Sequence, residues 1–81
     1  MSIYNLLVIL KDGDLDLADH PFIEQLNELI TLLYKIAETD QYQLIDLAID
    51  KANKIKKLML DHYIINDAEV LHNVIVRIAS N

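Results

Sequence analysis

The chain has 81 residues, of which 13 are acidic and 7 are basic, so its formal net charge is −6. Hydrophobic residues make up 53 %, with one glycine, one proline and no cysteine. These values exclude disulfide scaffolds and thiolate metal sites, which need cysteine, and collagen-like or low-complexity chains, which need glycine or proline. So apolar a chain can bury enough surface to fold, and its length fits one domain, residues 1–81.

The first apolar segment, residues 3–11, is compatible with two structures. As a helix, it would be capped by Ser2 and stopped by Gly13. As a strand, it would turn at Asp12-Gly13 into the alternating residues 14–17 and form a β-hairpin. We favour the helix, because the alternation within residues 3–11 is poor and the remaining chain has helical patterns.

The second segment predicts a helix that ends near Glu38. Asp19 can cap it, and Pro21 would lie in the first turn, where its missing N–H costs nothing. Apolar residues recur with a period of 3.6 residues. They are Phe22, Ile23, Leu26, Leu29, Ile30, Leu33, Ile36 and Ala37.

A third helix is predicted directly after the second. Asp40 and Gln43 fit a capping box at its start. Its apolar residues cover more than half of the circumference, so we expect this helix to contact at least two neighbours. They are Leu44, Ile45, Leu47, Ala48, Ile49, Ala52, Ile55, Leu58 and Met59.

A fourth helix is predicted to start at Asn66, because residues 66–69 again resemble a capping box, and to end near Ala79. Its apolar stripe consists of Val70, Leu71, Val74, Ile75 and Ile78. Short connections favour antiparallel neighbours. The sequence therefore predicts an all-α, antiparallel bundle of three long helices and a short N-terminal helix, with an N-terminal β-hairpin as the alternative.

Two patterns that could bind a metal each lack an essential part. Asp12, Asp14 and Asp16 have the spacing of a calcium loop, but Leu17 and Ile23 stand where that loop needs glycine and glutamate. Glu69 and His72 form one Glu-x-x-His pair, whereas di-iron bundles need two such pairs and further glutamates. We therefore predict no metal-binding residue.

Nucleophilic chemistry also finds no support in the sequence. Ser2 and Ser80 are both terminal, and nothing places a base beside a hydroxyl. We predict no catalytic residue, no cofactor and no enzymatic activity.

The lysines of residues 51–57 could bind nucleic acid, but acids interrupt them. Asp50 and Lys54 are one helical turn apart, and so are Lys57 and Asp61. A phosphate-binding stripe would not alternate with acids in this way, so we expect no binding to nucleic acid. A dimeric nucleic-acid-binding regulator that uses Lys51–Lys57 is kept as an alternative.

More apolar surface remains than a lone small bundle can bury. Residues 3–10 are apolar nearly all round, and two further apolar residues, Leu32 and Val76, fall on polar helix faces. Such surface is typical of a contact with another chain. We therefore predict a homo-oligomer, most simply a dimer, and a partner interface at Tyr4, Leu6, Val8, Ile9, Leu32 and Val76.

The acids gather in the first half of the chain, where they either keep the domain soluble or imitate DNA toward a basic partner. The candidate acidic surface consists of Asp12, Asp14, Asp16, Asp19, Glu24 and Glu28. A target that normally binds DNA would be blocked by such a surface.

The function predicted from these features is protein binding. We expect a stoichiometric inhibitor, neutraliser or regulator of another protein, with a structural or assembly subunit of a larger complex as the alternative. No signal peptide and no membrane span are visible in the sequence, so we expect a cytoplasmic protein.

Overall fold

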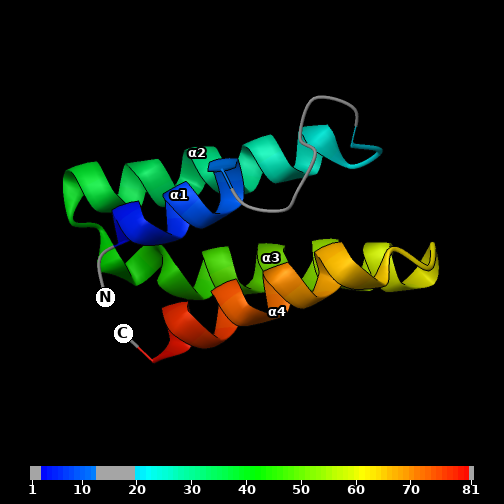
Figure 1. The fold of residues 1–81 in the computed structure, drawn as a ribbon. Helices are drawn as coiled ribbons and strands as arrows, with labels where there is room; N and C mark the ends of the chain where they lie inside the picture. The colour runs from blue at the N-terminus through cyan, green and yellow to red at the C-terminus, as the bar shows by residue number, and fades with distance from the viewer. Residues whose placement is uncertain (1–2, 13–19, 81) are drawn as a thin grey trace.

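The computed structural model describes residues 3–12 and 20–80, without the side chains of Ile3, Leu6, Ile9, Lys11 and Asp12. The described residues form four α-helices, α1 (Ile3–Asp12), α2 (Ile23–Thr39), α3 (Ile45–Asp61) and α4 (Ile65–Ala79), and a short 3₁₀ helix, η2 (Tyr42–Leu44) (Figure 1). The predicted all-α bundle is confirmed, and residues 3–12 are helical. Residues 13–19, which include the alternative hairpin's second strand, lie outside the described residues.

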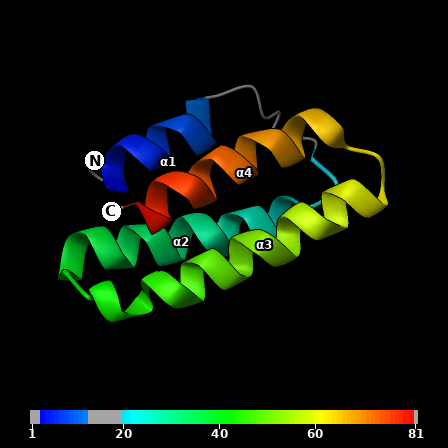
Figure 2. The same ribbon diagram turned by 90° about the horizontal axis from the view of Figure 1, so that it is seen from below.

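The helices form a ring in which each packs against two others. α2 packs against α1 and α3, and α4 packs against α3 and α1 (Figures 1 and 2). α2, α3 and α4 alternate in direction, as short connections require. The two neighbours expected for the third helix are therefore confirmed as α2 and α4.

One apolar core lies inside the ring. Each fully buried Val, Leu or Ile side chain contributes about 1.5–3 kcal/mol to folding. The buried apolar side chains are Leu7, Leu10, Leu26, Leu29, Ile30, Leu33, Ile36, Ala48, Ala52, Ile55, Met59, Ala68, Leu71, Val74 and Ile78. The buried stripe of α3 is narrower than its sequence pattern predicts, because Leu47 is 52 % exposed.

The helix starts differ from the predictions in each of the three long helices. α2 begins at Ile23, after a turn at Pro21 and Phe22, so Pro21 precedes the helix. Asp40 does not open α3, since it ends α2 in the left-handed conformation (φ 55°), and η2 separates it from α3. α4 begins at Ile65 without a side-chain cap, so the predicted box from Asn66 is wrong.

Within the described residues, none of the helices has both the length and the apolar character that a membrane crossing requires.

Candidate functional site

The end of the molecule where α3 meets α4 is tied to the start of α2 by a buried histidine. The His20 side chain is 3 % exposed, and its Nε2 lies 2.8 Å from Oδ2 of Asp67, in the first turn of α4. The backbone N–H of Phe22 donates to His20 Nδ1 over 3.1 Å. Because this N–H can only donate, Nδ1 must accept, and the ring proton on Nε2 is donated to Asp67.

Aromatic contacts continue this connection to the end of α3. The Phe22 ring lies 5.9 Å from the His20 ring and 5.3 Å from the His62 ring, the second pair meeting edge to face. Edge-to-face packing of this kind is favourable for aromatic rings. Both nitrogens of His20 are occupied, so this histidine positions the starts of α2 and α4 rather than facing a ligand.

The turn between α3 and α4 has the hydrogen bonds of a Schellman motif, with a tyrosine in the position that glycine usually takes. Ile64 N–H donates to the carbonyl of Met59 (2.8 Å), and Tyr63 N–H donates to that of Leu60 (3.1 Å). Tyr63 has φ 61° and is 87 % exposed. A bulky residue at positive φ is uncommon, since its Cβ crowds the backbone. The turn therefore projects an aromatic ring into solvent despite a conformational cost.

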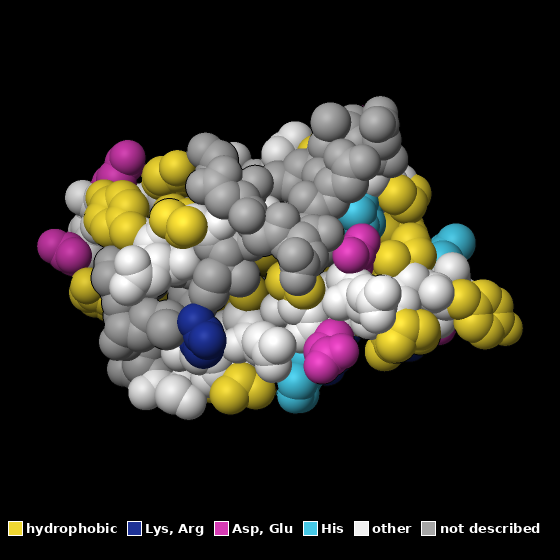
Figure 3. Space-filling view, in the orientation of Figure 1, with side chains coloured by type: hydrophobic (Ala, Val, Ile, Leu, Met, Phe, Trp, Pro, Cys, Tyr) yellow, Lys and Arg dark blue, Asp and Glu magenta, His cyan; other side chains and the backbone are white. Residues whose placement is uncertain are grey.

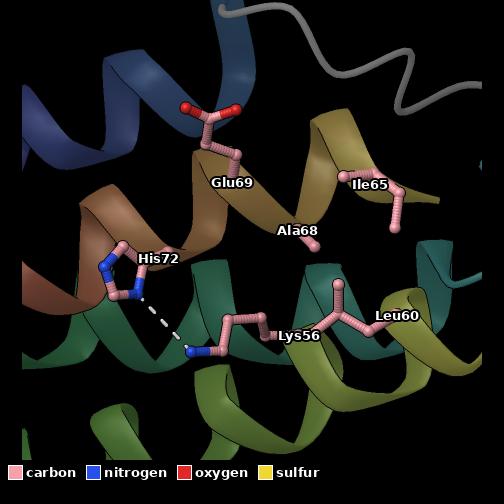
Figure 4. Close-up of a pocket in the computed structure, with 6 residues that line it drawn as sticks. All are labelled: Lys56, Leu60, Ile65, Ala68, Glu69 and His72. Atoms are coloured by element: carbon pink, nitrogen blue, oxygen red, sulfur yellow. Dashed lines mark hydrogen bonds between the residues drawn. The ribbon is translucent and has the colours of Figure 1, made fainter. Parts of the chain in front are cut away.

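A groove of about 350 Å³ lies between α3 and α4 beside this turn. Ala68 is buried, while Leu60 and Ile65 are 44 % and 54 % exposed. Lys56, Glu69 and His72 complete the lining (Figure 4). Figure 3 shows apolar side chains gathered at this end of the molecule.

The polar residues of the groove point in different directions. Lys56 Nζ lies 3.5 Å from Nδ1 of His72, so the two side chains meet across the groove. The carboxylate of Glu69 points away from them (Figure 4). The groove thus combines an apolar part near the turn with a basic part farther along both helices. We call it the α3–α4 groove.

The predicted partner interface is distributed over three helices. Tyr4 and Val8 of α1 and Val76 of α4 are about half exposed. Leu32, which the sequence placed on a polar face, is half-buried against the core and lines a shallow hollow of about 380 Å³ on α2. The side chains of Leu6 and Ile9 lie outside the described residues.

Only two members of the predicted acidic surface have described side chains. Glu24 and Glu28 are exposed on α2, and Glu28 Oε2 accepts a hydrogen bond from Lys51 Nζ over 2.9 Å. Lys51 therefore connects α3 to α2 rather than joining a free basic stripe. The side chain of Asp12 and the residues Asp14, Asp16 and Asp19 lie outside the description, so the calcium-like spacing does too.

The sequence pattern shows neither the α3–α4 groove nor the His20–Asp67 pair. Its spacing relates Glu69 to His72 on one helix, whereas His72 contacts Lys56, 16 residues away on α3. In the described part of the chain, no three histidine, aspartate or glutamate side chains gather as metal ligands.

Comparison with known proteins gives no match: no family model, no curated protein and no solved structure is similar to this chain.

Proposed function

We propose that the chain acts by binding another protein, as a stoichiometric inhibitor, neutraliser or regulator. The observation that supports this proposal best is the cluster of exposed apolar side chains around the α3–α4 turn. Leu60, Tyr63 and Ile65 lie within six residues of one another and are 44 %, 87 % and 54 % exposed. Burying such side chains against a partner would contribute roughly 25 cal/mol for each Å² removed from water.

The net charge of −6 fits an encounter with a partner whose overall surface is basic. Opposite net charges raise the association rate, while the affinity depends mainly on the buried apolar anchors. The charge therefore speeds the encounter, and the α3–α4 end holds the complex.

Affinity capture with the full chain tests this proposal. The chain is immobilised and exposed to an extract of its native host at 0.15 M salt, beside two variants, Ile65→Glu and Leu47→Glu. Ile65 and Leu47 have nearly equal exposure, 54 % and 52 %, but only Ile65 lines the α3–α4 groove. We expect one protein in a fixed ratio on the wild type and on Leu47→Glu, and little on Ile65→Glu.

Three outcomes would contradict the proposal. Recovery of no protein at either low or physiological salt would refute protein binding. Recovery that nuclease treatment abolishes would favour the alternative of a nucleic-acid-binding regulator. A chain purified from its host only as part of a large complex would favour a structural subunit.

A further inference from the structure

The α3–α4 groove has two chemically different halves, separated by one helical turn. On α3, Leu60 follows Lys56 by four residues, and on α4, His72 follows Ala68 by four residues. Side chains with this spacing share one helix face and have Cβ atoms about 5–6 Å apart. The apolar half at Leu60, Ile65 and Ala68 therefore lies one turn from the basic half at Lys56 and His72.

Among the described residues, no carboxylate lies within ion-pair distance of Lys56. The two ion pairs of that part of the chain join Lys51 to Glu28 and His20 to Asp67. Glu69 also lines the groove, but its carboxylate points away from Lys56 (Figure 4). The Lys56 ammonium has three hydrogens, and the 3.5 Å contact with His72 Nδ1 can use one of them, so two remain for another acceptor. Other described lysines also lack an ion pair, but Lys56 is the one that lines this groove, where its ammonium lies beside the apolar half and can meet an external carboxylate.

The openness of the groove favours a side chain of a partner protein over a free small molecule. Its volume of about 350 Å³ is near the lower end of the range for small-molecule sites. Leu60 and Ile65 are about half exposed, so a small ligand would keep much of its own surface in water. A partner chain, in contrast, can cover the rim with the residues around its anchor.

Resting on the protein-binding function above, we propose that the α3–α4 groove binds an amphipathic helix of the partner. This helix carries a leucine-sized side chain and, one turn away, an aspartate or glutamate. The apolar side chain packs on Ala68 between Leu60 and Ile65. The carboxylate accepts a hydrogen bond from Lys56 Nζ, which lies 3.5 Å from Nδ1 of His72. Grooves between helices bind amphipathic helices through such one-turn spacings.

The negative charge of the whole chain does not prevent this contact. At 0.15 M salt the Debye length is about 8 Å, so distant acids are screened while a direct ammonium–carboxylate contact is not. The partner's overall charge governs the encounter, and the local carboxylate governs the fit.

A peptide titration tests the proposal directly. The probe is an acetylated, amidated, alanine-based helical peptide with one leucine and one glutamate four residues later. It is added to the ¹⁵N-labelled full chain at 0.15 M salt, and amide shifts are followed by NMR. We expect the largest shifts at residues 60, 65, 68 and 72. Replacing the leucine of the peptide by alanine should weaken binding about tenfold, because one buried apolar anchor is lost.

The charged contact is isolated by a double-mutant cycle. Replacing the glutamate of the peptide by glutamine should weaken binding about two- to fivefold, as for a solvent-accessible ion pair. In Lys56→Gln, the two peptides should bind equally. Lys54→Gln is the matched control, because Lys54 is an exposed lysine of α3 that does not line the groove, and it should keep the difference.

Several results would overturn the proposal. These are equal binding of the two peptides by the wild type, shifts centred on α1, and tighter binding of octanoate than of the peptide at the same residues. Groove shifts that grow with protein concentration alone would identify a second copy as the occupant.

If a native partner is captured equally by wild type and Lys56→Gln, the proposed groove chemistry is wrong while the proposed protein binding stands. If no protein is captured, the proposed function itself fails.

Discussion

Two regions of the molecule expose apolar side chains to a similar degree but differ in shape. On the outer side of α1, Tyr4 and Val8 are 50 % and 57 % exposed and stand one turn apart on a single helix. At the α3–α4 end, Leu60 and Ile65 are 44 % and 54 % exposed and come from two helices joined by the Tyr63 turn. The first region is a ridge, and the second is a groove with a buried floor at Ala68.

This difference in shape determines what each region can recognise. An apolar stripe on one helix can pack against the same stripe of a second copy, with the side chains of each interdigitating with those of the other, so it suits a symmetric contact. A groove between two helices with an apolar and a basic half imposes both shape and charge on its occupant. We therefore assign self-association to α1 as a proposal, and binding of a different protein to the α3–α4 end.

The largest effect is expected from a substitution that detaches α1 from the bundle. Leu10 is fully buried and anchors α1 in the core. Leu10→Ala should lower the free energy of unfolding by about 2–5 kcal/mol, through lost transfer energy and a residual cavity. Urea unfolding followed by circular dichroism measures this. Val8→Ala, on the exposed side of the same helix, is the control and should change stability by less than about 0.5 kcal/mol. Equal effects of the two substitutions would mean that α1 is not anchored in this way.

A second substitution tests the hydrogen bond between Asp67 and His20. Asp67→Ala leaves Nε2–H of the buried His20 without its acceptor, which should cost about 1–3 kcal/mol of unfolding free energy. Asn66→Ala is the control in the same turn of α4. If Asn66 capped the helix, as the sequence suggested, its replacement would cost about 1 kcal/mol. We expect almost no loss for Asn66→Ala in thermal unfolding, and the reverse order would restore the capping role.

The helices themselves could be predicted, whereas their starts could not. The 3.6-residue period of Leu26, Leu29 and Leu33 depends only on which side of a helix faces the core, so it is visible in the sequence. In the first turn of α4, Asp67 pairs with His20, which is 47 residues away in the sequence and reaches it only through the fold. Local capping patterns therefore predict the wrong role for the polar residues near the helix starts.

The candidate site was less accessible to sequence reasoning for a similar reason. The spacing of Glu69 and His72 is that of one metal-ligand pair on a helix, yet the Glu69 carboxylate points away from the Lys56–His72 contact. Tyr63 occupies a helix end where glycine is expected. Because a tyrosine does not mark a helix end in the sequence, this position is recognised only once the end of α3 is known.

Val8→Glu is expected to have the smallest effect on folding. It also gives the most direct test of self-association through α1. Val8 is 57 % exposed, so a charge there should change stability by less than about 0.5 kcal/mol. In a dimer formed through α1, the same charge would be buried against the partner copy, and desolvating it without a counter-charge would prevent association. Sedimentation at high micromolar concentration should therefore show self-association for the wild type and a monomer for Val8→Glu.

Leu47→Glu provides the matched control for this measurement, since Leu47 is 52 % exposed but lies on α3. Its self-association should equal that of the wild type, because the new carboxylate stays in water in both states. A monomeric wild type would remove α1 as an interface and leave the α3–α4 end as the binding region. Dissociation by both substitutions would instead attribute the effect to added negative charge on a chain that already carries −6.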